Sequence, residues 1–135
     1  DDDVLERVGV AEVARIPAPL FLRMLPPLRR RFMDFATVRG MAYPGVVAVV
    51  RGQRSIGLVF HELVHVVQYE QLGVRAMLAR YFADYAESGW SYMSITAERN
   101  AQDLQERFDR EPGRRFRVKD EVFAAFGRTI NPPTA

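Results

Sequence analysis

The chain contains no cysteine and only two histidines in 135 residues. Without cysteine there are no disulfides, thiolate zinc sites or cysteine nucleophiles, so any bound metal must use nitrogen and oxygen ligands. Long apolar runs are also missing, because Arg51 and Arg54 interrupt the most apolar stretches before they reach the roughly 18 residues of a membrane span. We therefore expect a soluble protein with no membrane partner.

The charge has no dominant sign. Lysine and arginine total 19 and aspartate and glutamate total 17, which leaves a net charge of +2. Basic residues cluster twice, at Arg23 with residues 29–31 and at Arg114, Arg115, Arg117 and Lys119. Such clusters occur on surfaces that bind nucleic acids or acidic partners, but the near balance of charges favours solvated arginines on an ordinary surface. No nucleic-acid partner is expected.

Length and composition are those of a single globular domain over residues 1–135. The chain is long enough to bury its own core, and 48% hydrophobic with 27% charged residues is the ordinary globular mixture. The start, Asp1-Asp2-Asp3, shows no basic segment followed by an apolar one, so no signal peptide is visible. A trimmed chain would look the same, and the cellular location stays open.

One motif indicates a chemical activity. Residues 61–65 read His-Glu-Leu-Val-His, and a helix over residues 54–72 would put His61 and His65 on one face, one turn apart. Two neutral imidazoles at this spacing can hold a zinc ion, and Glu62 beside them can act as general base toward a zinc-bound water. The alternative is a chance spacing on a solvated helix face.

The residues around the motif favour a buried site. Apolar side chains precede and follow the histidines, at Ile56, Leu58, Val59, Phe60, Leu63, Val64, Val66 and Val67. A helix that is apolar on most faces is buried. Burying two imidazoles and a carboxylate without partners would cost several kcal/mol, and a metal ion would satisfy them directly.

A catalytic zinc takes three protein ligands, so the third ligand must be an aspartate or a glutamate. A helix over residues 94–110, capped by Ser94, would place Glu98 on a stripe facing the core. The rest of that stripe is apolar: Ile95, Ala101, Leu104 and Phe108. Glu98 is therefore our predicted third ligand, and the alternative is a buried salt bridge from Glu98 to Arg80 or Arg99.

Three further polar residues are less favoured candidates for a role at the site. Asp84 is the next choice for the third ligand, and Glu87 follows it because Glu87 falls off the apolar stripe of its helix. Gln68 lies one turn beyond His65 and could support a ligand through a hydrogen bond.

Periodicity and turn residues predict the N-terminal elements. An amphipathic helix is expected over residues 4–16, ended by Pro17, and a helix broken at Pro26 is expected over residues 20–33. β-branched runs predict two strands, over residues 36–39 and 46–50. The turn between these strands holds Gly40, Pro44 and Gly45.

The rest of the chain is expected to be helical. Ser55 should cap the motif helix and Gly73 should end it. Further helices are expected over residues 74–87, with a Met and aromatic stripe in the core, and over residues 118–126. The predicted class is α+β, mostly helical, with a small sheet or β-arm before the motif helix.

Residues 60–69, Leu72-Gly73 and residues 97–101 resemble the minimal gluzincin-type zinc metallopeptidase domains. They are especially similar to small bacterial peptidase-like domains, some of them linked to extracellular contractile injection systems. The resemblance covers residues 35–108 and implies a zincin-like fold with zinc on His61, His65 and Glu98 and with Glu62 as base. The chain departs from metzincins, because residues 68 and 71 are glutamines where that group has glycine and histidine.

The sequence therefore predicts a zinc-dependent hydrolase, in first place a metallopeptidase with peptide or protein substrates. The strand before the motif helix would pair with an extended substrate, or would be a plain β-arm. A hydroxyl should stabilise the oxyanion, and by residue type Tyr92 ranks ahead of Tyr85 and Tyr43. The alternative function is a catalytically inactive, zinc-stabilised protein-interaction module, in which the metal site would be closed.

Overall fold

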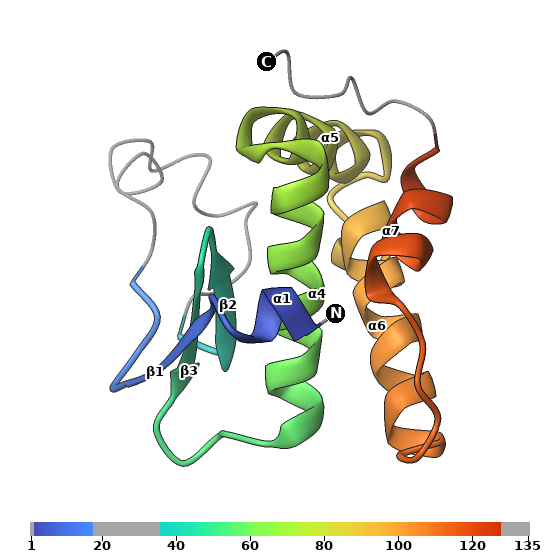
Figure 1. Ribbon diagram of the computed structural model, residues 1–135. Helices are drawn as coiled ribbons and strands as arrows, with labels where there is room; N and C mark the ends of the chain where they lie inside the picture. Colours follow the sequence, from blue (N-terminus) through green and yellow to red (C-terminus); the bar gives the residue numbers. More distant parts are fainter. Residues whose placement is uncertain (1, 18–35, 128–135) are drawn as a thin grey trace.

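The chain forms five helices and one small sheet in a computed structural model that describes residues 2–17 and 36–127 (Figure 1). In order the elements are α1 (Asp2–Leu5), β1 (Gly9–Val13), β2 (Gly40–Tyr43), β3 (Val46–Val50), α4 (Ile56–Leu72), α5 (Val74–Glu87), the 3₁₀ turn η1 (Tyr92–Ser94), α6 (Thr96–Arg110) and α7 (Val118–Phe126). The class is α+β, as predicted. None of the helices in the described ranges is long and apolar enough to cross a bilayer.

The sheet has the strand order β1-β3-β2. β1 runs parallel to β3 and β2 runs antiparallel to it, so that Gly9 and Tyr43 both lie opposite Val46. β3 is apolar throughout, and its Val47 and Val49 are completely buried, which suits a central strand rich in β-branched residues. Within the described part of the chain, β2 is left as an edge strand.

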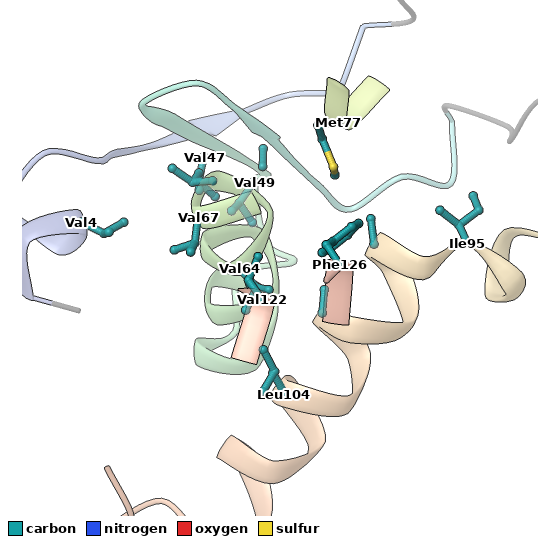
Figure 2. Packing of buried hydrophobic residues seen from close by; sticks show 14 of the residues in the cluster. Val4, Val47, Val49, Val64, Val67, Met77, Ile95, Leu104, Val122 and Phe126 are labelled. Atoms are coloured by element: carbon teal, nitrogen blue, oxygen red, sulfur yellow. The ribbon is translucent and has the colours of Figure 1, made fainter. Parts of the chain in front are cut away.

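Helix α4 lies between the sheet and the helices α6 and α7, while α5 crosses one end of it (Figure 1). A single apolar cluster joins these layers (Figure 2). Its members include Val47 and Val49 of β3, Val64 of α4, Leu104 of α6 and Val122 of α7. Because α4 is packed on several sides, its sequence is apolar nearly all round.

Both ends of α4 follow the predicted signals. Ser55 Oγ accepts a hydrogen bond from the backbone N–H of Leu58 at 3.1 Å. At the other end Gly73 has φ of 78°, a left-handed conformation that favours glycine, and its N–H donates to the carbonyl of Tyr69. The predicted cap and stop are therefore confirmed, as are the predicted helices that became α5 and α7.

The predicted N-terminal helix over residues 4–16 is wrong. The helix α1 ends at Leu5, and Gly9–Val13 forms the strand β1. Apolar residues in this segment have helical spacing, but pairing with β3 satisfies the backbone groups of β1, and this tertiary contact outweighs the local pattern. The helix predicted over residues 20–33 lies outside the described residues.

Two predicted boundaries also need correction. The strand expected over residues 36–39 is Gly40–Tyr43, because the turn at Pro44 and Gly45 sets the register of β2 against β3. Helix α6 begins at Thr96 and is not capped by Ser94, which lies in η1. The backbone N–H of Thr96 instead donates to Asp84 Oδ2 at 3.0 Å, so a residue of α5 caps α6.

Candidate metal centre

Three side chains from two helices meet at one point. His61 and His65 lie one turn apart on α4, and Glu98 lies in the first turn of α6, which packs against α4. The two Nε2 atoms are 3.2 Å apart, and Glu98 Oε2 is 3.4 Å from His61 Nε2 and 3.3 Å from His65 Nε2. In the described part of the chain, no other group of three histidine or acidic side chains is close enough to hold a metal. The structure thus brings together the three residues predicted as ligands.

This triangle has the dimensions of a zinc site. Atoms placed tetrahedrally at about 2.0–2.1 Å from zinc are about 3.3–3.4 Å from one another, close to the spacing seen here. Glu98 Oε2 is buried and forms no hydrogen bond, although it faces both imidazoles. A buried carboxylate oxygen that forms no hydrogen bond is costly, and a cation among the three atoms would remove that cost. The residues therefore fit a metal ion of the zinc type.

The electrostatics of the cluster also favour a cation. Burial alone would raise the pKa of Glu98, but the facing imidazole of His65 lowers this pKa well below its usual range. Burial alone would lower the pKa of His65, but the Glu98 carboxylate outweighs it and raises this pKa to about 9. Near neutral pH a carboxylate therefore faces a protonated imidazole, and a metal ion would take the place of that proton.

Gln68 connects the two ligand-bearing helices behind the cluster. It is completely buried, and its Oε1 lies 2.8 Å from His65 Nδ1. Its amide nitrogen donates to the carbonyl of Ala97 at 3.0 Å and to Asn100 Oδ1 at 2.9 Å. Because two acceptors hold the amide nitrogen, the amide oxygen must face His65, whose Nδ1 must then carry a proton. The other nitrogen, Nε2, is thereby directed at the cluster as a metal ligand would be.

Glu62 lies beside the cluster without joining it. Its side chain is buried, and its carboxylate lies near the backbone N–H of Ala42 on β2. Burial raises the pKa of Glu62, although the nearby imidazoles of His65 and His61 partly offset this effect. A carboxylate whose pKa is raised, held at the border of the cluster, is suited to taking up a proton.

Tyrosine hydroxyls surround Glu98. Tyr81 donates to Glu98 Oε1 at 3.1 Å, and the hydroxyl of Tyr92 lies close enough to this carboxylate to feel its charge. Burial of the hydroxyls, together with the charge of Glu98, raises the pKa values of Tyr81 and Tyr92 far above the usual range, so both remain protonated. Tyr81 is missing from the sequence prediction, which assigns its stripe to the core. The signal that could have identified Tyr81 is that a buried tyrosine hydroxyl needs a hydrogen-bond partner.

Of the two other predicted tyrosines, Tyr43 lies at the site and Tyr85 does not. Tyr43 lines the cavity in front of the cluster, together with Tyr69. Tyr85 is buried elsewhere, with its ring centroid 5.3 Å from that of Trp90. Tyr85 therefore has no place at the site.

The structure supports neither the alternative salt bridge of Glu98 nor the alternative third ligands, Asp84 and Glu87. Glu98 pairs with the histidines, whereas Arg80 donates to Asp84 Oδ1 at 2.7 Å. Asp84 also caps α6, and although burial opposes it, the hydrogen bond from Thr96 lowers the pKa of Asp84. Glu87 is exposed at the end of α5. Neither Asp84 nor Glu87 joins the cluster.

A cavity of about 660 Å³ opens in front of the cluster. All five predicted site residues line it: His61, Glu62, His65, Tyr92 and Glu98. Much of the remaining wall is apolar and comes from α4 and α5, at Leu58, Val74, Met77, Leu78 and Phe82. Comparisons with protein-family models, curated proteins and solved structures give no match for this chain. The functional assignment therefore rests on the geometry of the chain itself.

Proposed function

We propose that this protein is a zinc-dependent hydrolase with a zincin-like, gluzincin-type site, and that it cleaves peptide bonds. The observation that carries the proposal is the triangle of His61 Nε2, His65 Nε2 and Glu98 Oε2, with sides of 3.2, 3.3 and 3.4 Å. Three protein ligands leave a fourth tetrahedral position open, as catalytic zinc sites do. The cavity of about 660 Å³ gives a substrate access to that position.

The residues around the triangle have separate tasks. A zinc ion held there would supply a Lewis acid that polarises a carbonyl and lowers the pKa of water. Glu62 takes the proton of the attacking water and delivers it to the leaving amine, because its carboxylate borders the cluster and burial raises its pKa. Tyr92, protonated and beside Glu98, offers its hydroxyl to the oxyanion that develops on the carbonyl.

Among the described strands, β2 is an edge strand, and this supports a peptide as the substrate. The N–H of Val50 donates to the carbonyl of Arg39, so in the antiparallel ladder residues 39, 41 and 43 bond toward β3. Gly40 and Ala42 therefore present their backbone groups on the opposite edge, where the N–H of Ala42 lies near Glu62. An extended peptide that pairs with this edge would carry its own backbone past the proposed base.

Two measurements test the proposal, zinc content first and peptide cleavage second. Elemental mass spectrometry should find near-stoichiometric zinc in the wild type and in Glu62→Gln, and should find it lost in Glu98→Ala. The wild type should then cleave members of a mixed peptide library, and Glu62→Gln should not. Zinc without any cleavage would favour an inactive interaction module, and no zinc after reconstitution would contradict the metal site itself.

A further inference from the structure

A second cavity lies away from the metal cluster. Its volume is about 950 Å³, larger than the cavity of about 660 Å³ at the cluster, and none of His61, His65 and Glu98 lines it. Its walls come from α1, residues 56–67 of α4, and the chain from the end of α6 to the start of α7. We call this cavity the rear groove. It is independent of the proposed hydrolase site.

The interior of the rear groove is apolar, and its mouth carries exposed apolar side chains. Val59 and Leu63 of α4 and Phe116 line it. Ile56 and Leu5 line it as well, and they remain 77% and 59% exposed. Large apolar side chains that stay in water beside a cavity mark a surface that binds another molecule.

The rim of the rear groove is cationic. Among the residues that the structure describes, four arginines line it, Arg54, Arg114, Arg115 and Arg117, against one acid, Asp2. This places most of the second basic cluster of the sequence around one cavity. The net charge of these lining residues calls for an occupant that carries negative charge as well as apolar groups.

These arginines are available to a partner. Arg54, Arg114 and Arg117 form ion pairs with Glu12, Glu111 and Asp120 at 3.4, 2.8 and 3.8 Å. Both members of each pair are exposed, and such surface pairs contribute little and exchange readily. Arg115 is exposed and forms no ion pair with any residue in the described ranges.

We propose that the rear groove docks a segment of a partner protein that carries large apolar side chains flanked by aspartate or glutamate. The cations come from two separate connections, at Arg54 before α4 and at residues 114–117 before α7. Several carboxylates spaced along a chain match such a distribution, whereas a fatty acid has one charge at one end. Arginine forks bind carboxylates in a bidentate manner, and arginine with aromatic residues is typical of interface hot spots.

Selection from a random 16-residue peptide library displayed on phage, with the full chain as bait, tests this proposal. We expect the enriched peptides to combine acidic residues with Leu, Phe or Trp. Fluorescence anisotropy on the synthesised peptides should show binding that is weakened about tenfold or more by Ile56→Glu and by Arg115→Glu, and weakened by added salt. Both substituted side chains are exposed, so the variants should fold.

Two exposed residues outside the rear groove provide matched controls. Phe123→Glu adds the same charge to an apolar surface position of α7, and Arg75→Glu reverses a charge on α5. Both should bind the enriched peptides as the wild type does. The proposal is overturned if no peptide is enriched, if the enriched peptides lack acids, or if all four variants bind alike. It is also overturned if anionic vesicles or DNA, and no peptide, bind in an Arg115-dependent manner.

Discussion

Glu62 and Gly40 are in direct contact where α4 meets the edge strand β2. A β-carbon built on Gly40 would lie 2.9 Å from Glu62 Oε1 and 3.1 Å from its Cγ. Gly40 is not among the glycines with positive φ, so what requires glycine here is the space that the carboxylate occupies. The smallest residue of the edge strand thus helps to set the position of the proposed base.

Gly40→Ala should therefore reduce peptide hydrolysis while sparing the metal. The added methyl group would displace the Glu62 carboxylate, and a displacement of this size lowers kcat by about 10- to 100-fold. Zinc content should stay unchanged, because Glu62 is not one of the three proposed ligands. Gly9→Ala is the control, since a β-carbon there meets nothing within 4 Å. Equal kcat values for the two variants would contradict the proposed position of the base.

Gln68→Met should weaken zinc binding by about 10- to 100-fold. The substitution removes the acceptor that holds the proton on His65 Nδ1, and with it the link from α4 to Ala97 and Asn100. Zinc affinity is measured by competition with a chromophoric chelator, and nitrogen chemical shifts of His65 report the tautomer.

Gln71→Met is the matched control for that variant. Gln71 lies on the same helix, and its amide donates to the carbonyl of Lys119 at 2.9 Å, away from the cluster. This variant loses a contact between α4 and α7 but should keep the zinc affinity and the His65 tautomer of the wild type. A similar loss of affinity in both variants would mean that Gln68 acts through helix packing alone.

Zinc binding should release about one proton at pH 7. The pKa of His65 facing Glu98 is raised to about 9, so after chelator treatment this imidazole is protonated at pH 7 and must lose its proton to bind metal. Above that pKa the imidazole is already neutral, and the release should fade as the pH rises through 9. Calorimetric titrations in buffers of different ionisation enthalpy measure the number of protons. Zero release at pH 7 would contradict the charged pair.

Asp84→Ala should cost about 1 kcal/mol of unfolding free energy, because it removes the acceptor that caps α6. Urea unfolding measures this loss. The matched control is Asp103→Ala, which alters an exposed aspartate in the middle of α6. Zinc should remain stoichiometric in both variants, and its loss in Asp84→Ala alone would restore Asp84 as a ligand.

Local chemistry is sufficient to predict α4 and the histidines it carries. Residues four apart in any helix lie one turn apart, so the spacing of His61 and His65 alone determines that both imidazoles share a face. Ser55 and Gly73 mark the helix ends through their own side chain and backbone preferences. Glu98 can be inferred in the same way, since a carboxylate within an apolar stripe needs a partner.

Only the tertiary structure decided which distant groups meet. Gly9–Val13 is a strand because its backbone partners lie on β3, far along the chain, and no local pattern contains them. Tyr81 and Asp84 both lie on α5, and the packing of α5 against α6 decided that Tyr81 binds Glu98 while Asp84 caps the helix. The distance between α4 and α6 depends on contacts such as Gly57 against Asp109, where a β-carbon would come within 2.9 Å. Periodicity assigns a side chain to a face, but only packing brings two faces close enough to share one ion.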